Sequence, residues 1–564
     1  MVDATTIGLL ASEIILIGVA AFVIVAGAFS PKSSRWWPIF GAICFAVVLG
    51  SFGILNRFTA DSLMQSSGIP AFSGPLVVDY FSTLTRQAVL VLGLLFALLF
   101  WRRDHDQLAS ERMGLLVIMM VGLMIVAQAN DLVVMFLGLE MVSIPTYVML
   151  FLGRRDRAGM EATAKYFFLS ILSSALLLYG FSFLYGLGGT TRMVGTDSIA
   201  TALASAASSS PLVPIALILI LAGLGFKAGA VPFHFYAPDV YQGATNYNAG
   251  LLAIVPKIAS FAAMARLIVG LVPAGYDFGW QLPLGLAVAT MSLGNVCALW
   301  QRNIRRMLAY SSIAHTGYLL MGVASAVALS RSYGVSAMTF YPMAYSLTSL
   351  TVFAALTHLE SENKSVDRIE DLSGLGLTNP IVAGAIAIAM FSFGGIPIFA
   401  GFWGKYGLFT SALQLVQLES PMSRWFLILA VAGAINAAVA AAYYLRIVAI
   451  MFFDTSRAAL PAAGGMGPFS SMLASVLLVL GIGLFPGATM QRAQIADESM
   501  PHGPNLGSMP DAPRGVRTLG SITPSGATPS GETQGQTASD GSRSAGSLAV
   551  SQASGDDRLP HAEP

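Results

Sequence analysis

Long apolar segments, separated by short polar connections, recur along most of this chain. Each approaches the roughly 20 residues that an α-helix needs to cross the hydrocarbon core of a bilayer. The pattern therefore predicts an all-α polytopic membrane protein with about 14 transmembrane helices. The predicted segments are 5–29, 38–55, 81–101, 113–129, 131–152, 163–187, 211–233, 247–271, 281–300, 308–329, 334–357, 381–413, 425–451 and 467–488.

The polar connections predict the orientation of these segments. Short cytoplasmic connections are enriched in Lys and Arg, and the basic residues of this chain concentrate after odd-numbered segments. We therefore expect the odd connections in the cytoplasm and both termini on the periplasmic side. Arg266, near the outer end of its segment, is expected to anchor at the interface. The odd connections hold Lys32, Arg35, Arg102, Arg103, Arg112, Arg154, Arg155, Arg157, Arg302, Arg305, Arg306, Lys364, Arg368 and Arg457, and the even ones little beyond Arg57, Arg192, Arg331 and Arg424.

The composition changes abruptly after residue 488. The sequence of 489–564 is dominated by small and polar residues and has too few apolar ones to form a core. We therefore predict a transmembrane domain over 1–488 and a disordered Ser/Gly/Pro-rich tail over 489–564. We favour a dispensable extension over a docking role for this tail.

The composition also excludes several function classes. Of 564 residues, 55% are hydrophobic and only 10% charged, whereas about a quarter of a soluble domain is charged. The formal net charge of +1 gives no basic surface for nucleic acid. The two cysteines, Cys44 and Cys297, lie far apart, and the six histidines form no i, i+4 pair. With no Gly-rich nucleotide motif either, we expect no redox cofactor, metal or nucleotide site in this chain.

Five ionisable side chains fall inside the apolar segments: Glu140, Lys227, Lys257, His315 and Lys405. A charge near the bilayer centre costs roughly 2.5–3.5 kcal/mol on insertion scales, and such residues usually mark ion paths or proton relays. For Glu140 the alternative is a structural carboxylate, for Lys227 a lysine that snorkels to the interface, and for His315 a hydrogen-bonded core histidine. We predict that the five form a proton path.

Two of these lysines lie beside helix breakers. Lys227 is followed by Pro232, and Lys405 follows a run that contains Gly394, Gly395 and Pro397. Unwound backbone inside a membrane is tolerated where it is buried in protein or lines a cavity. Because the two segments are five apart, we predict two related five-helix repeats, each with a broken helix. The repeats are placed at about 113–271 and 281–451, in inverted orientation as in many transporters, although the pattern alone does not establish the inversion.

At these residues the chain resembles the antiporter-like, proton-translocating subunits of bacterial NADH-quinone oxidoreductase, respiratory complex I. The matching segments are DLVVMFLGLEM at 131–141, KYF at 165–167, FKAGAVPFHFYAPDVYQGA at 226–244, ALWQRNIRRMLAYSSIAHTGY at 298–318 and GGIPIFAGFWGK at 394–405. Two segments depart from the family pattern: ATNYNAG at 244–250, and the Ser/Gly/Pro-rich tail. The first leaves the geometry at the cytoplasmic end of 247–271 open.

The resemblance implies a role for each intramembrane charge. The residues matching Glu140 and Lys227 form a modulating pair, and those matching Lys257 and Lys405 carry the proton, with His315 between them. A lysine at 405 favours subunit N over subunit M, and the lack of a long amphipathic C-terminal helix argues against subunit L.

The resemblance further implies a translocase subunit in a bacterial inner membrane. NADH, FMN, iron–sulfur clusters and quinone are then expected on partner subunits, and neighbouring membrane-arm subunits are the expected protein partners. Two alternatives remain at this stage. A subunit of a multisubunit cation/proton antiporter would use the same residues without a redox partner, and a membrane scaffold would not need the charges for transport.

Overall fold

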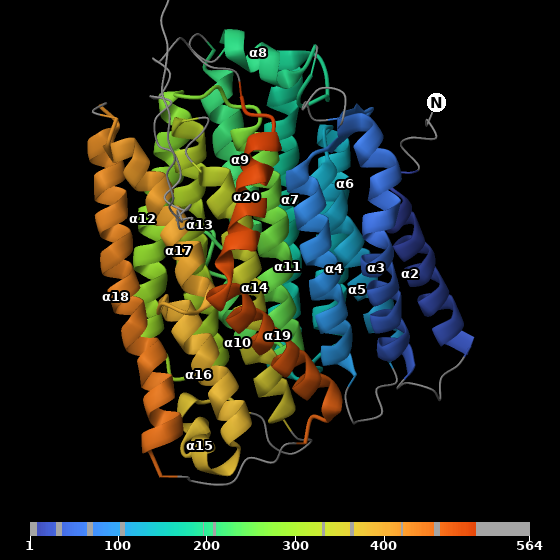
Figure 1. Cartoon of the computed structure of the whole chain (residues 1–564), viewed down its shortest axis with the longest axis vertical. Helices are drawn as coiled ribbons and strands as arrows, with labels where there is room; N and C mark the ends of the chain where they lie inside the picture. Colours follow the sequence, from blue (N-terminus) through green and yellow to red (C-terminus); the bar gives the residue numbers. More distant parts are fainter. Residues whose placement is uncertain are drawn as a thin grey trace, which may run out of the picture. The chain divides into compact units, whose positions relative to one another are not determined.

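The computed structural model describes residues 8, 10–29, 36–64, 71–101, 108–195, 197–206, 210–329, 333–360, 366–418, 421–455 and 463–503, with the backbone alone described at 53–64 and 71–73. Helices dominate this part of the chain and run largely alongside one another (Figure 1). Each of the predicted apolar segments contains at least one of these helices. The all-α fold class is therefore confirmed.

The helices follow the order of the predicted segments. The first part of the chain forms α2 (Ala11–Phe29), α3 (Trp36–Met64), α4 (Tyr80–Phe100), α5 (Ala109–Gln128), α6 (Leu132–Phe151), α7 (Arg157–Gly188), α8 (Ile199–Ala206), α9 (Leu212–Ala228), α10 (Ala237–Gly243), α11 (Asn246–Met264) and the π-helix η1 (Ala265–Val269). The second part forms α12 (Asp277–Leu299), α13 (Ile304–Ala328), α14 (Gly334–His358), the 3₁₀-helix η2 (Ile369–Leu372), α15 (Leu375–Thr378), α16 (Pro380–Gly394), α17 (Ala400–Val416), α18 (Ser423–Phe453), α19 (Met466–Leu484) and α20 (Pro486–Ser499).

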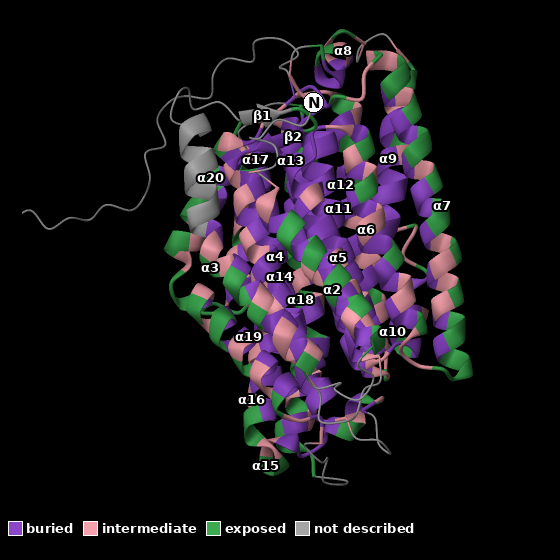
Figure 2. Cartoon of the chain, turned by 90° about the vertical axis from the view of Figure 1, so that its right-hand side faces the viewer, coloured by how far each residue is buried: buried purple, intermediate pink, exposed green. Residues whose placement is uncertain are grey.

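Length and hydropathy qualify nine of the described helices as membrane spans, with three shorter apolar helices besides. The total of 14 crossings thus stays a prediction. Helices α13 and α14 are less apolar but almost wholly buried, and α11 is buried along nearly its whole length. Figure 2 shows buried positions concentrated on the inner helices and exposed ones on the outer helices. Because neighbouring helices shield the central ones from lipid, polar side chains can be accommodated there if they find partners.

Both predicted broken helices are present. The helix α9 ends at Gly229 (φ +75°) before α10, and α16 ends at Gly395 (φ +80°) before α17. Both glycines adopt the left-handed conformation that disfavours any residue with a Cβ atom. In Figure 1, α9 and α10 follow one another toward the end of the bundle that carries α15, whereas α16 and α17 run in the opposite direction. This opposite course agrees with inverted repeats.

The predicted start of the tail is wrong. Residues 486–499 form α20, whose Asp497 carboxylate accepts a hydrogen bond from the N–H of Ser336 at the start of α14. Ser499 Oγ accepts another from the N–H of Tyr80 at the start of α4. The sequence of α20 is too polar to resemble a membrane helix, so the composition placed the boundary too early. The predicted disorder over the rest of the tail falls on 504–564, outside the described residues.

The expected interfacial role of Arg266 is also wrong. Its guanidinium is 4% exposed and forms two hydrogen bonds, of 2.5 and 2.7 Å, with the Asp79 carboxylate. Burial stabilises such a pair only when both charges are matched. A second buried pair joins Glu13 of α2 to Arg86 of α4, and Gln128 donates a further hydrogen bond to Glu13. These pairs connect the first helices to the rest of the bundle.

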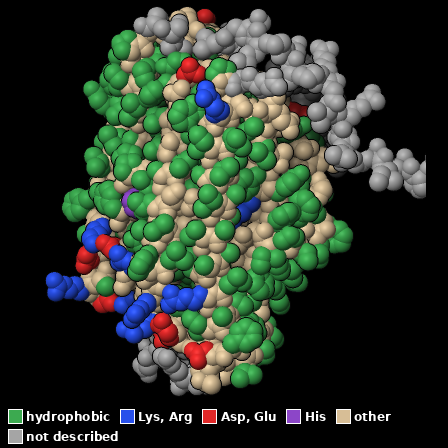
Figure 3. All heavy atoms as spheres, turned by 90° about the vertical axis from the view of Figure 1, so that its left-hand side faces the viewer, with side chains coloured by type: hydrophobic (Ala, Val, Ile, Leu, Met, Phe, Trp, Pro, Cys, Tyr) green, Lys and Arg blue, Asp and Glu red, His purple; other side chains and the backbone are tan. Residues whose placement is uncertain are grey.

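A small hairpin precedes α4, with β1 (Ala71–Ser73) antiparallel to β2 (Leu76–Val78) and Ala71 opposite Val78. Its strands are too short for a period-two pattern to predict. On the face drawn in Figure 3, hydrophobic side chains cover most of the surface, and charged ones gather near the end that carries α10 and α15. This is the distribution expected of a membrane protein with one strongly charged end.

Candidate proton path

The first predicted pair, Glu140 and Lys227, is in contact. Glu140 lies on α6 and Lys227 in the last turn of α9, and the ammonium nitrogen is 3.4 Å from Glu140 Oε1. The lysine side chain is 6% exposed and that of the carboxylate 22%. A cation in the last turn of a helix is also favoured by the partial negative charge at that end. Lys227 therefore does not snorkel to the interface.

Two serines complete the coordination of this ion pair. Lys227 Nζ donates to Ser143 Oγ at 2.6 Å and to Ser174 Oγ at 3.3 Å. Ser174 Oγ in turn donates to Glu140 Oε1 at 2.5 Å. The buried charges thus have hydrogen-bond partners as well as each other, which low-dielectric surroundings require. These serines could not be predicted from the sequence, because they lie on α6 and α7 without any spacing relation to Lys227.

A small cavity lies between Lys227 and Lys257. Its walls include Tyr166 and Tyr241 beside the two lysines, and it encloses about 10 Å³. A polar cavity needs about 10–15 Å³ to hold one water molecule. Lys257, on α11, points to α13, where Ser312 accepts hydrogen bonds from its ammonium at the carbonyl oxygen (2.5 Å) and at Oγ (2.7 Å).

Hydrogen bonds hold the start of α11, whose geometry the sequence left open, to two neighbouring helices. Thr245 caps α11 by accepting from the N–H of Asn248, and the Asn248 amide donates to the carbonyl of Met149 at 2.7 Å. Arg305 Nη1 donates to Asn246 at 3.2 Å. These contacts fix the helix that carries Lys257 against α6 and α13.

His315 lies on α13, in the second predicted repeat. It is 3% exposed, and both ring nitrogens have hydroxyl partners: Tyr341 at 2.5 Å from Nδ1 and Tyr444 at 3.0 Å from Nε2. Tyr341 comes from α14 and Tyr444 from α18. The histidine is thus satisfied in the core, as the alternative interpretation expected, but by groups that can themselves exchange protons.

Lys405 lies at the second helix break. Its ammonium donates to the carbonyl oxygens of Phe393 at 2.8 Å and Gly394 at 3.3 Å, which are the last carbonyls of α16. It also lies 5.0 Å from the centre of the Tyr318 ring, within the range of a cation–π contact. Among the described residues, no carboxylate forms an ion pair with Lys405 or Lys257.

The five predicted residues lie on α6, α9, α11, α13 and α17, and contacts or a shared cavity link the first four in turn. Contacts join Glu140 to Lys227, and a cavity joins Lys227 to Lys257. Tyr345 lies between Lys257 and His315, 4.3 Å from the ammonium and 5.0 Å, centre to centre, from the imidazole. The sequence did not identify the tyrosines, because aromatic residues are common in membrane helices and these come from two distant helices.

A charged cluster lies on the charged end of the bundle near the cavity. Asp239, on α10 and outside the predicted membrane segments, pairs with Lys165 and with Arg306 at 2.8 Å each. Partial burial acts to raise the pKa of the Asp239 carboxyl, but the hydrogen bonds and charges of the two cations outweigh it and hold the pKa below its ordinary value. The same short helix contributes Tyr241 to the cavity.

Comparison with known proteins identifies the family. A family model described as "NADH:quinone oxidoreductase/Mrp antiporter, TM" matches residues 129–436. NADH-quinone oxidoreductase subunit N of Methylobacterium nodulans is 38% identical over 461 residues, covering 80% of this chain and 90% of the relative. The chain belongs to the subunit N family of NADH-quinone oxidoreductases.

Solved structures of membrane complexes contain chains with the same fold. A chain of respiratory complex I from Thermus thermophilus with bound aureothin is 29% identical, with a TM-score of 0.68 over 85% of this chain and 98% of that one. A chain of the Mrp complex from Dietzia sp. superimposes with a TM-score of 0.70 over 88% of this chain and 97% of that one, at 21% identity. The second likeness shows that the fold is shared beyond subunit N.

Among the described residues, no group of three His, Cys, Asp or Glu side chains could hold a metal ion. The polar groups around the five predicted residues are instead lysines, a histidine, serines and tyrosines. All of these can accept or release protons or relay them through hydroxyls. The arrangement is therefore suited to proton transfer.

Proposed function

We propose that this chain is the proton-translocating subunit N of a bacterial NADH-quinone oxidoreductase and that protons cross it by way of Lys227, Lys257, His315 and Lys405. The observation that carries the proposal is the alignment of these groups on one buried route between two helix breaks. A buried lysine without a carboxylate partner can lose its proton without leaving a buried carboxylate unpaired. Lys257 and Lys405 are therefore the carriers, and Lys227, beside Glu140, is the modulator.

The route has a direction in this proposal. Protons enter from the cytoplasm near α10, reach Lys227 and Lys257 through the small cavity, pass His315, and leave past Lys405 to the periplasm. The driving force is electrostatic. Two unit charges about 8 Å apart interact by roughly 2 kcal/mol at an effective dielectric constant of about 20, equivalent to about 1.5 pKa units. Separating Glu140 from Lys227 would therefore gate protonation of Lys257.

The same proposal implies the membrane, the orientation and the partner subunits of the chain. The chain lies in the bacterial inner membrane with both termini in the periplasm, beside other membrane-arm subunits. NADH, FMN, iron–sulfur clusters and quinone bind to partner subunits, and this chain holds no redox cofactor. Reporter fusions at both termini test the orientation, and a cytoplasmic reporter signal at either end contradicts it. Deletion of 504–564 should leave assembly and pumping near normal.

Replacement of Lys405 tests the function directly. Lys405→Ala removes a buried charge from α17 and introduces a good helix former, so the complex should still assemble. We expect coupled proton pumping to fall by more than about fivefold, because a proton-transfer group commonly contributes at least a hundredfold to the step it serves. Arg446→Ala is the control, since the Arg446 side chain is 38% exposed and forms an ion pair with Glu370 at 3.6 Å. Normal pumping in assembled Lys405→Ala complex would refute the proposal.

A cation/proton antiporter subunit is the second candidate, favoured by the description of the matching family model and by the fold shared with the Mrp chain. It would use the same lysines without electron transfer. Purification of the tagged chain in mild detergent separates the two candidates. Copurification of an NADH-oxidising arm supports subunit N, and a complex that lacks NADH oxidation supports the antiporter. A scaffold without transport predicts that removal of the lysines leaves pumping intact.

A further inference from the structure

His315 is held between two hydroxyl groups rather than between a donor and a fixed acceptor. Tyr341 lies 2.5 Å from Nδ1 and Tyr444 lies 3.0 Å from Nε2. The Tyr444 hydroxyl is also 2.5 Å from Ser311 Oγ, and in that contact either oxygen can be the donor. Ser311, Tyr444, His315 and Tyr341 therefore form one continuous chain of four groups. All four are buried, with exposures of 3% or less.

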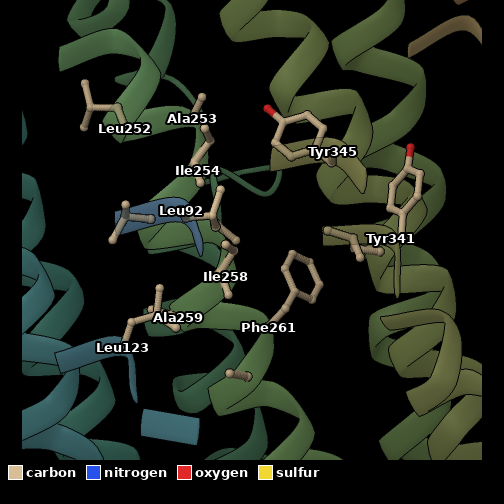
Figure 4. Close-up of a cluster of buried hydrophobic side chains, with 14 of the residues drawn as sticks. Leu92, Leu123, Leu252, Ala253, Ile254, Ile258, Ala259, Phe261, Tyr341 and Tyr345 are labelled. Carbon is tan, nitrogen blue, oxygen red and sulfur yellow. The ribbon is translucent and has the colours of Figure 1, made fainter. Parts of the chain in front are cut away.

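The two ends of this chain approach Lys257 and Lys405 through neighbouring residues. Ser311 precedes Ser312, which accepts both hydrogen bonds of the Lys257 ammonium. At the other end, the ring of Tyr341 packs so closely on Gly404 that a Cβ atom there would lie 2.3 Å from it. Gly404 directly precedes Lys405. In Figure 4, Tyr341 and Tyr345 project from the same helix, beside Ile258 and Phe261 of α11.

Simple donor counting restricts the chain to two arrangements. A neutral imidazole has one N–H donor and one acceptor nitrogen, and each hydroxyl donates once. If Nδ1 carries the proton, it donates to Tyr341, so Nε2 accepts from Tyr444 and Tyr444 accepts from Ser311. If Nε2 carries the proton, every bond in the chain is reversed. Any mixture of the two leaves a buried donor facing a donor, or an acceptor without a proton, which is costly.

We propose that Tyr341 and Tyr444 are proton carriers that, with His315, pass one proton at a time from the Lys257 side to the Lys405 side. The proposal rests on the proposed function of the chain. In the first arrangement, a proton accepted at Ser311 Oγ releases the Ser311 hydroxyl proton to Tyr444. Tyr444 gives its own proton to Nε2, Nδ1 gives its proton to Tyr341, and Tyr341 releases its proton toward Lys405. One O–H or N–H bond forms at each group as one breaks.

The transfer leaves the chain in the second arrangement. A second proton cannot follow from the same side until the hydroxyls rotate and the imidazole exchanges tautomer. The chain therefore carries one proton for each reset. Such a requirement gives the second half of the protein a barrier against proton leakage that neither lysine provides by itself.

Removal of single hydroxyls tests the chain. In Tyr341→Phe and Tyr444→Phe, we expect coupled turnover and pumping by the assembled complex to fall at least about fivefold, because each change removes a link while retaining the ring. Tyr443→Phe is the matched control: its ring lies 4.4 Å, centre to centre, from that of Tyr444, but its hydroxyl donates to Asn295 Oδ1 at 2.9 Å. Its activity should stay within about twofold of wild type. Equal activity of all three variants overturns the proposal.

A second measurement separates proton transfer from packing. Fluorotyrosine introduced at position 341 keeps the ring and hydroxyl but makes the hydroxyl more acidic, so it accepts a proton less readily from Nδ1. A relay predicts that coupled turnover changes by at least about twofold and that its pH profile shifts. A packing role predicts neither, and an unchanged pH profile at normal assembly overturns the relay.

The Lys405→Ala variant distinguishes the two proposals. If it pumps normally, the proposed function fails whatever the tyrosine variants do. If it pumps poorly while Tyr341→Phe and Tyr444→Phe pump normally, the function stands and the hydroxyl relay fails. If all three pump poorly and Tyr443→Phe pumps normally, both stand.

Discussion

Each of the two broken helices has a buried lysine at a helix end, but the groups that contact the two lysines differ. In each, a glycine in the left-handed conformation ends a helix and a lysine lies at the negative end of that helix dipole. Lys227 belongs to the last turn of α9 itself, whereas Lys405 reaches back from α17 to the terminal carbonyls of α16. Among the residues that the structure describes, only the first of these lysines has a carboxylate within 4 Å, namely Glu140 at 3.4 Å.

This difference assigns the two breaks different roles. At the first break the ion pair makes the charged lysine favourable, so Lys227 is best suited to hold charge and influence its neighbours. At the second break, carbonyl dipoles and the Tyr318 ring partly compensate the charge of Lys405. A proton can therefore leave Lys405 without abandoning a buried carboxylate, which would be costly. Under the proposed function, the half with Lys227 modulates proton transfer and the half with Lys405 releases the proton.

The largest effect expected from this comparison is in a double-mutant cycle at the first break. Glu140→Gln leaves Lys227 buried without its counter-charge, and Lys227→Met leaves Glu140 in the same state. Each change should lower pumping at least about tenfold, and the two together should cost less than the sum, with a coupling of about 1–3 kcal/mol in the activation free energy. Pumping rates of the four assembled complexes measure it. Glu140→Asp, which conserves the charge, should retain much more activity.

Strict additivity in that cycle would contradict the comparison. It would mean that Glu140 and Lys227 act independently, although they are in contact. A second double mutant, Glu140→Gln with Lys405→Ala, gives a reference for this cycle, because Lys405 lies in the other half of the chain. That combination tests whether the two breaks belong to one transport cycle.

Much of this arrangement could be predicted from the sequence. The apolar segments, the five intramembrane charges and both breaks follow from hydropathy and from glycine and proline positions. The last helix of the bundle, α20, could not be predicted from the sequence. It contains Gln491, Arg492 and Asp497, and its burial depends on contacts with α4 and α14. Local composition carries no information about such distant partners.

The hydroxyl groups of the site could not be predicted from the sequence either. Ser174 and Tyr444 contact Lys227 and His315 from helices more than 50 residues away. Serine and tyrosine are tolerated throughout membrane helices, so neither residue stands out as a charge does. A charge inside a membrane has to be explained, whereas a hydroxyl can be satisfied by its own helix backbone.

A smaller effect is expected from replacing the two glycines that end α9 and α16 by alanine. Gly229→Ala and Gly395→Ala each force a residue with a Cβ atom into the left-handed region, at about 1–2 kcal/mol. At Gly395 the new Cβ would also lie 3.0 Å from Lys405 Cδ, whereas at Gly229 the nearest atom is Ile313 Cγ1 at 3.9 Å. Both variants should lose similar thermal stability, but only Gly395→Ala should lower pumping severalfold. Equal pumping by both variants would show that the position of Lys405 is not critical.

The smallest effect concerns the charged cluster beside the first break, which has no counterpart at Lys405. Lys165 and Arg306 lower the pKa of Asp239, so this carboxylate stabilises the fold above its unfolded pKa of about 3.9. The contribution is lost as the pH falls below that value through the lowered folded pKa. Because Asp239 is 37% exposed, solvent screening limits the effect to below about 1 kcal/mol. Asp239→Asn should therefore reduce thermal stability slightly at pH 7, and the difference from wild type should shrink as the pH falls below about 3.9 and in high salt. A difference that shrinks neither in acid nor in high salt would assign the loss to packing of α10 rather than to charge, and the electrostatic contrast between the two breaks would then be confined to Glu140 and Lys227.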